Sequence, residues 1–230
     1  RFDGVPRSTR TSLSDDHLCI ARDSYWCGGV VGPSGRLPRG SSTFSQPSDW
    51  QPSFFMAANT STSWKGNRID VGVADMKCSD DPIGYLATRA LGSCIGLTAY
   101  DPITKVGGLL HYMLGQPRDK DKARLHPHMF ALSGVPALFR AICELGGQRE
   151  RLIVCAAGGA VILDDPDGYS IGKRNHAVLR KLFWKNGIVL HGEDCGGSAV
   201  RDMKLDLGTG QVIVSSQNEE KRLWPVLTKS

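Results

Sequence analysis

Apolar residues alternate with polar or small residues in several short stretches of this chain, a pattern typical of half-buried β-strands. The first stretch is IDVGVADM, in which Ile69, Val71 and Val73 are the apolar positions. The chain is therefore expected to be rich in short strands. Further strands, some with a continuous apolar run instead of alternation, are predicted over residues 84–91, 95–100, 106–114, 151–157, 188–194, 201–207 and 211–215.

Two other stretches repeat their apolar residues at helical spacing. Residues 129–145 predict a helix that stops at Gly146-Gly147, and Pro136 inside it predicts a late start or a kink. Residues 174–187 predict an amphipathic helix with Gly187 as its C-terminal cap. Its inward face is expected to carry Val178, Leu179, Leu182 and Phe183.

Together these elements predict one mixed α/β domain over residues 69–215, with many strands and two main helices. Residues 1–55 are rich in Ser, Pro and Gly and show no period, so they are expected to be disordered. The first methionine is Met56, which favours a mistranslated upstream segment; a genuine disordered extension is the alternative. Residues 56–68 are expected to be a flexible lead-in, and residues 216–230 a charged, frayed tail.

The composition is that of an ordinary globular protein, with 40% hydrophobic and 22% charged residues in a chain of 230. No stretch is apolar for the roughly 18 residues that a membrane helix needs, and the N-terminus lacks the apolar core of a signal peptide. The seven cysteines are odd in number and include no Cys-x-x-Cys pair, which favours reduced thiols in the cytoplasm. The net charge of +5 comes without a basic run between aromatic residues, so nucleic-acid binding is not favoured, and the charge fits an acidic protein partner at least as well.

The segment LGSCIGLTAYDPITKVGGLLHYML places a cysteine and a histidine on two strands that Asp101-Pro102-Ile103-Thr104 can join as a β-turn. In such a hairpin, facing residues have numbers that sum to 205, so Cys94 and His111 are predicted to be directly opposed. Pro102 favours a looser loop, and a slip of one residue would put the two side chains on opposite faces.

A cysteine beside a histidine indicates nucleophilic chemistry. A free thiol has a pKa of about 8.5, and a neighbouring imidazole can accept its proton and leave a nucleophilic thiolate. Gly92 and Ser93 allow a turn whose backbone N–H groups could bind an oxyanion, so the group predicts acyl chemistry on an amide or ester. The structural alternative is a buried cysteine near an unrelated strand histidine.

Two glycine pairs follow predicted strands, Gly158-Gly159 and Gly196-Gly197. Neither pair has the spacing of a phosphate-binding loop. Both are instead interpreted as places where backbones approach closely near the site.

The motifs LGSCIGL, YDPITKVGGLLHYML, AAGGA, IGKRN and EDCGG, followed by Arg201, resemble the chemoreceptor glutamine deamidase (CheD) family over residues 69–215. The resemblance implies a layered sandwich of mixed β-sheets flanked by helices. It implies an enzyme that hydrolyses the side-chain amides of particular glutamines on the cytoplasmic helices of bacterial chemoreceptors and releases ammonia. Some members of the family also bind the chemotaxis phosphatase CheC, so a regulatory binding partner with little hydrolytic activity is the alternative function.

The resemblance also implies roles for single residues. Cys94 corresponds to the nucleophile, His111 to the general base, and Thr88, six positions before the cysteine, to the third active-site residue. Neither a cofactor nor a metal ion is expected. Leu132 and Ser198 stand where the family pattern has other residues.

Overall fold

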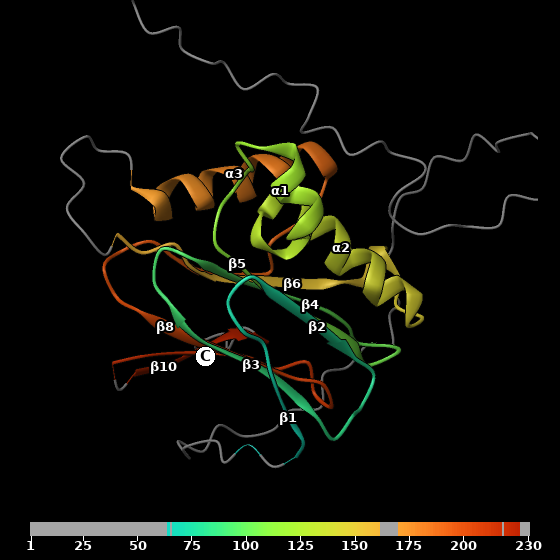
Figure 1. Cartoon of the computed structure of the whole chain (residues 1–230). Helices are drawn as coiled ribbons and strands as arrows, with labels where there is room; N and C mark the ends of the chain where they lie inside the picture. The colour runs from blue at the N-terminus through green and yellow to red at the C-terminus, as the bar shows by residue number, and fades with distance from the viewer. Residues whose placement is uncertain (1–63, 65, 162–169, 218, 226–230) are drawn as a thin grey trace, which may run out of the picture.

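Two five-stranded β-sheets and a group of helices form three layers in the computed structural model, which describes residues 64, 66–161, 170–217 and 219–225. Sheet A has the strand order β1-β3-β8-β9-β10, and sheet B the order β2-β5-β4-β6-β7. In Figure 1 the helices lie above sheet B, and sheet A lies below it. Both sheets mix parallel and antiparallel pairs, so the predicted mixed α/β sandwich is confirmed.

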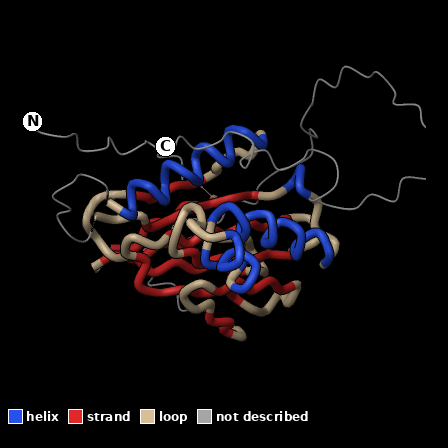
Figure 2. Tube along the Cα trace, turned by 45° about the horizontal axis from the view of Figure 1, so that its top comes forward, coloured by secondary structure: helices blue, strands red, loops and turns tan. Residues whose placement is uncertain are grey.

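The strands of sheet A are β1 (Arg68–Asp70), β3 (Tyr85–Leu91), β8 (Arg201–Asp206), β9 (Val212–Ser216) and β10 (Glu219–Trp224). Those of sheet B are β2 (Asp75–Ser79), β4 (Ile95–Asp101), β5 (Val106–Tyr112), β6 (Ile153–Gly158) and β7 (Gly192–Cys195). The helices are α1 (Lys120–Leu125), α2 (Ala131–Glu144) and α3 (Ile171–Asn186), with short 3-10 turns η2 (Pro127–Met129) and η3 (Arg149–Arg151). Figure 2 shows the helices gathered on one side of the strands.

Sheet B is covered on both faces. One face packs against α2 and α3 around Leu138, Leu179 and Phe183, and the other packs against sheet A around Leu109 and Met203. All residues of β4, β5 and β6 are therefore buried, which explains why these strands are largely apolar instead of alternating. In sheet A, by contrast, β8 alternates between buried and half-buried residues, because only one of its faces meets this core.

The predicted second helix is confirmed, and its C-terminal cap Gly187 has a left-handed φ of 62°. The first helix begins at Ala131 and contains Pro136, so the alternative of a start after the proline is wrong. Pro136 is the sixth residue of this helix, so its missing N–H removes one intrahelical bond, to the carbonyl of Leu132, and the helix continues through it.

Two boundaries differ from the sequence predictions. The predicted strand at residues 69–76 is split between β1 and β2, because the chain turns at Ala74, whose φ is 57°. The tail predicted to fray after Ser216 instead forms β10, which pairs antiparallel with β9. The predictions for residues 1–55, and for the lead-in up to residue 63, fall outside the described residues.

None of the described helices is long and apolar enough to cross a membrane. The thiols of Cys78, Cys94, Cys155 and Cys195 are free, as predicted. Cys143 is disulfide-bonded, so the prediction of reduced thiols is wrong for this residue.

Candidate active site

The hairpin of β4 and β5 differs in register from the sequence prediction. His111 faces Gly96, Ile95 faces Tyr112, and Asp101 faces Val106, so facing residues sum to 207 instead of 205. Cys94 and His111 are therefore not directly opposed, and that prediction is wrong by two positions.

The cause is the loop that joins the strands. It has four residues, Pro102 to Lys105, and the N–H of Lys105 donates to the carbonyl of Asp101 over 2.8 Å. The Asp101 carboxylate accepts from the N–H of Ile103 over 2.9 Å, and Lys105 takes a left-handed φ of 58°. Pro102 cannot adopt the positive φ of a tight two-residue turn, so the longer loop shifts the register.

A shift of two residues keeps the same face, so the two side chains still lie on one side of sheet B. A side chain at Gly96 would meet Leu91 and Met203, which shows that this face looks toward sheet A. Cys94 packs against the same inter-sheet cluster. Cys94 directly precedes β4, so Cys94 and His111 both lie toward the seam between the two sheets, at the same end of the hairpin.

Thr88 reaches His111 across this seam. Its Oγ1 lies 2.8 Å from Nδ1 of His111, and both side chains are buried, at 1% and 0% exposed. The Thr88 hydroxyl also donates to the carbonyl oxygen of Val71 over 2.8 Å. A hydroxyl has one proton, so its oxygen must accept the proton on Nδ1 of His111.

The hydrogen bonds therefore determine the tautomer of the histidine. With the proton on Nδ1, the lone pair is on Nε2, and Nε2 is buried with no hydrogen-bond partner among the described residues. Burial lowers the pKa of His111 below its ordinary value of 6.5, so the imidazole is neutral near pH 7. The residue has the form that a general base requires.

Cys94 lies in a bend between β3 and β4 and is half-buried. Burial raises the pKa of its thiol, and the hydrogen bond from its own backbone N–H acts in the opposite direction. Burial raises the pKa of the other free thiols, Cys78, Cys155 and Cys195, to about 12. Cys94 is thus the least perturbed of the four free thiols, and it rests as a neutral thiol.

The bend is held by its carbonyl groups. The carbonyl of Gly92 accepts from the N–H of Ala160 over 2.8 Å, and that of Cys94 accepts from the N–H of Gly159 over 2.7 Å. The carbonyl of Ser93 accepts from the side-chain amide of Asn175 over 2.8 Å. All three carbonyls of the bend are therefore hydrogen-bonded within the protein, and its peptide N–H groups are the backbone groups left as candidate donors to a substrate.

These N–H groups are not equivalent. The N–H of Gly92 donates to the carbonyl of Ala90 over 2.9 Å, so in this conformation it is occupied. Within the part of the chain that the structure describes, the N–H of Ser93 has no backbone acceptor, and that of Cys94 points toward its own sulfur. Of the two residues predicted to bind an oxyanion, Ser93 keeps a free donor.

Gly158 explains why the glycine pair follows β6. Its φ is +111°, and a Cβ atom there would lie 2.3 Å from the carbonyl oxygen of Cys94. The carbonyl of Gly158 in turn accepts from the N–H of Gly196 over 2.8 Å. The predicted close backbone approach is confirmed for Gly158 and Gly159, whereas a Cβ atom at Gly196 or Gly197 would meet no backbone atom within 4 Å.

Asn175 is a residue of the site that the sequence analysis did not assign. It is buried on α3, and its amide nitrogen donates to the carbonyls of Ser93 and Met113 over 2.8 and 2.7 Å. It thereby ties the cysteine bend to the end of the histidine strand. The signal was present, because a polar residue stands on the inward face of this helix, four positions before Leu179.

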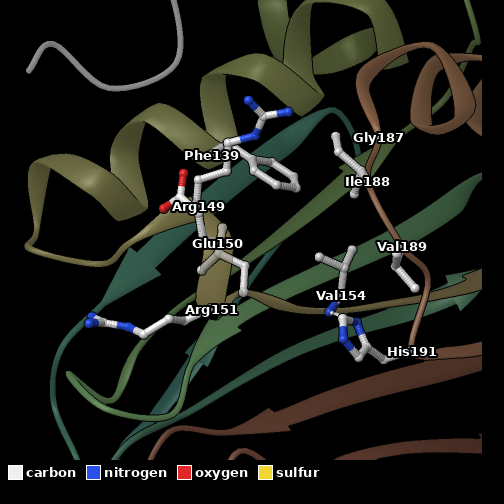
Figure 3. Close-up of a pocket in the computed structure, with 10 residues that line it drawn as sticks. Phe139, Arg149, Glu150, Arg151, Val154, Gly187, Ile188, Val189 and His191 are labelled. Carbon is white, nitrogen blue, oxygen red and sulfur yellow. Dashed lines mark hydrogen bonds between the residues drawn. The ribbon is translucent and has the colours of Figure 1, made fainter. Parts of the chain in front are cut away.

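A separate cavity of about 470 Å³ lies beside η3, between Phe139 of α2 and the segment from Gly187 to His191 (Figure 3). The guanidinium of Arg151 at its edge is bound to Asp101, and Nδ1 of His191 accepts from the N–H of Val154. None of the predicted site residues lines this cavity. We therefore do not assign it to the Cys94 site.

Comparisons with known proteins agree with one another. A family model described as CheD chemotactic sensory transduction matches residues 113–216. A protein of Solibacter usitatus, named a probable chemoreceptor glutamine deamidase CheD, is 46% identical over 159 residues, which cover 69% of this chain and 94% of the relative. A protein of Syntrophus aciditrophicus, named probable chemoreceptor glutamine deamidase CheD 1, is 48% identical over 149 residues, which cover 64% of this chain and 93% of the relative.

Proposed function

The chain belongs to the CheD family, and from this premise we propose that it is a chemoreceptor glutamine deamidase whose nucleophile is Cys94 and whose base is His111. The observation that carries the roles is the hydrogen bond between Thr88 and Nδ1 of His111, which leaves the buried Nε2 as a free acceptor. An acceptor in the seam beside a half-buried thiol suits proton transfer from sulfur.

The first step forms a thioester. Nε2 of His111 accepts the proton of the Cys94 thiol as the sulfur attacks the carboxamide carbon of a substrate glutamine. The carbonyl oxygen becomes an oxyanion, and we assign its binding to the free N–H of Ser93, with the N–H of Cys94 as a second donor. His111 then donates its proton to the leaving nitrogen, the C–N bond breaks, and ammonia departs.

The second step hydrolyses the thioester and leaves a glutamate residue on the receptor. Water attacks the thioester and gives a proton to His111, and collapse of the tetrahedral intermediate breaks the C–S bond. The proton returns to sulfur, which restores the neutral thiol and imidazole. In both steps Thr88 accepts from Nδ1 of His111 and holds the ring in one orientation, so we class it as a positioning residue.

The partners follow from the substrate. The proposed substrate is the cytoplasmic helical region of a chemoreceptor, which implies a cytoplasmic site of action. The net charge of +5 suits an acidic protein surface. A CheC-type phosphatase is a further partner that the family resemblance suggests.

Mass spectrometry of a co-expressed receptor fragment tests the proposed reaction, because each event replaces an amide NH₂ by a carboxylate oxygen. Cys94→Ala is expected to abolish the change, and the matched control Cys78→Ser to preserve it. Intact receptor glutamines with the wild-type protein would overturn the proposal. Tight binding of a CheC-type phosphatase by that inactive protein would favour the regulatory function instead.

Thr88 is tested by two substitutions that differ in one hydroxyl. Thr88→Val removes the acceptor for Nδ1 of His111, and we expect a barrier about 1–3 kcal/mol higher, or roughly a 5- to 150-fold loss of kcat. Thr88→Ser keeps the hydroxyl and should retain most of the activity. Alkylation of Cys94 by iodoacetamide should slow in parallel for Thr88→Val, and equal rates in both variants would contradict the positioning role.

A further inference from the structure

A second group of reactive side chains lies where α3 crosses the edge strand of sheet B. It consists of His176 from α3 and of Glu193 and Cys195 from β7, and their ligand-type atoms all lie within 4.8 Å of one another. Nε2 of His176 is hydrogen-bonded to Oε1 of Glu193. None of the three takes part in the proposed deamidation.

The strand geometry explains how these side chains meet. Glu193 and Cys195 are two positions apart on β7 and so point to the same face of sheet B, the face that α3 covers. Asp194 between them points to the opposite face, where it pairs with Arg201 and Lys221. One carboxylate and one thiol are thereby directed at the helix, away from the seam between the sheets.

The cluster is accessible as well as assembled. The side chains of His176 and Glu193 are 33% and 25% exposed, and Cys195 is half-buried with a free thiol. Nη1 of Arg180 lies 3.1 Å from Oε2 of Glu193, so one carboxylate oxygen is held by arginine while the other faces the histidine. This arrangement orients the carboxylate and leaves its inner oxygen toward His176 and Cys195.

We propose that His176, Glu193 and Cys195 form a binding site for a single divalent transition-metal ion of the zinc class. One imidazole nitrogen, one thiolate sulfur and one carboxylate oxygen are the donor types that Zn²⁺ accepts, and a water would supply the fourth ligand. Tetrahedral bond lengths of about 2.0–2.3 Å place ligand atoms about 3.3–3.8 Å apart. The hydrogen-bonded atoms of His176 and Glu193 must therefore move apart to admit the ion, while all three ligand atoms already lie within 4.8 Å of one another. Mg²⁺ and Ca²⁺ do not fit, because they require several oxygen ligands.

Binding has a definite proton balance. A carboxylate can only accept, so Nε2 of His176 carries the proton of its hydrogen bond with Glu193. When the ion binds, this proton moves through solvent to Nδ1 of the same ring, and Nε2 and the Glu193 oxygen each give a lone pair to the ion. The Cys195 thiol becomes a thiolate, so its proton leaves to solvent. No metal ion was expected from the sequence, because His176, Glu193 and Cys195 form no local metal-binding motif. The three residues come together only when α3 packs against β7.

The proposed metal site borders the deamidation site without sharing a ligand with it. Cys195 pairs in register with Gly158, whose backbone lies against the carbonyl of Cys94. A metal at Cys195 would therefore lie on β7, directly beside the strand β6 whose Gly158 supports the nucleophile. A cation that binds Cys94 and His111 instead is the competing explanation, and the test must separate the two.

The experiment titrates the full-length protein with Co²⁺, whose thiolate complexes absorb in the near ultraviolet, and with Zn²⁺ in a calorimeter. We expect one ion per chain, a thiolate-to-cobalt band and release of a proton. Cys195→Ser should remove the band and weaken Zn²⁺ binding by at least roughly tenfold, and His176→Gln should weaken it similarly. Melting curves of both variants check that they remain folded.

Three controls locate the ion. Cys94→Ala, Cys78→Ser and the double variant Cys19→Ser/Cys27→Ser should each bind Co²⁺ with the wild-type band and affinity. Zn²⁺ should also protect Cys195 from alkylation while Cys94 stays reactive. The proposal is overturned if the wild-type chain shows no thiolate band, if Cys195→Ser keeps it, or if Cys94→Ala or the double variant loses it.

Discussion

His111, the proposed base, shows at the scale of a single residue how burial and one hydrogen bond determine where the proton of a histidine ring lies. The side chain is completely buried, and its Nδ1 is committed to Thr88. Burial disfavours the charged ring, while the hydroxyl fixes which nitrogen has the proton. Because the folded protein disfavours the protonated ring, His111 is expected to lower the free energy of unfolding at low pH.

We predict that acid weakens the protein through this histidine. Burial lowers the pKa of His111 below 6.5, so in the window from about 6.5 down to the folded pKa the unfolded chain binds more protons. The free energy of unfolding should therefore fall as pH falls through that window. It is measured by urea unfolding at a series of pH values.

The control for this prediction is His191, because burial lowers its pKa as well. His111→Gln and His191→Gln should each flatten part of the pH dependence, and only His111→Gln should also abolish deamidation. A pH slope that both variants leave unchanged would show that neither ring is the acid-sensitive group.

Single residues were also where the sequence was least informative. Cys94 and His111 could be singled out from residue type and hairpin position, whereas Thr88 came only from family resemblance. Asn175 was not assigned, because its role depends on two carbonyls that are distant along the chain. Long-range hydrogen bonds leave no periodic pattern in a sequence.

At the scale of elements, strands were easier to predict than their register. Apolar runs and turn residues located β3, β4, β5, β6, β8 and β9, since burial and turn chemistry are local properties. Register depends on the conformation of the loop, and the difference between a two-residue and a four-residue loop displaced Cys94 by two positions. β10 was missed because four of its six residues are charged, as is common in an edge strand that avoids pairing with other molecules.

The glycine after β6 gives a prediction at this scale. Gly158→Ala should displace the bend that holds Cys94, because the new Cβ atom would lie 2.3 Å from the Cys94 carbonyl oxygen. We expect slower alkylation of Cys94 and a large loss of deamidation. The alkylation rate of Cys94 and the deamidation activity are measured for this variant together with its melting temperature.

Gly187→Ala is the matched control for backbone strain. Gly187 also has a positive φ, of +62°, but nothing lies within 4 Å of its Cβ position. This variant should lose about 1–2 kcal/mol of stability and keep the reactivity of Cys94. Equal loss of reactivity in both variants would mean that the effect is general destabilisation.

At the scale of the whole molecule, the layered order of helices, sheet B and sheet A explains which residues are available for chemistry. Sheet B is the central layer, and its strands β4 and β5 are buried on both faces. Sheet A closes over the face that holds His111, and β10 completes its edge with Leu223 in the inter-sheet cluster. The C-terminal strand thus belongs to the core of the domain.

We predict that Leu223→Ala destabilises the domain. Leu223 is 3% exposed, so its truncation should cost about 2–5 kcal/mol and lower the melting temperature by about 2–4 °C per kcal/mol. Leu125→Ala is the control, because Leu125 on α1 is 75% exposed and should melt like the wild type. Identical melting temperatures of both variants would mean that β10 does not contribute to the core and that this segment is frayed, as its charged residues suggested.

The contact between Thr88 of sheet A and His111 of sheet B has a consequence for how such a chain can change over generations. The proposed active site needs residues from both sheets. Duplication or exchange of one sheet alone would therefore not transfer its chemistry. Tolerance to inserted residues should differ accordingly between the two ends of one hairpin. The loop from Pro102 to Lys105 lies at the end of the hairpin remote from Cys94, so inserted residues there should be tolerated. The bend from Gly92 to Cys94 connects the two sheets beside the site, so insertions there should not be tolerated.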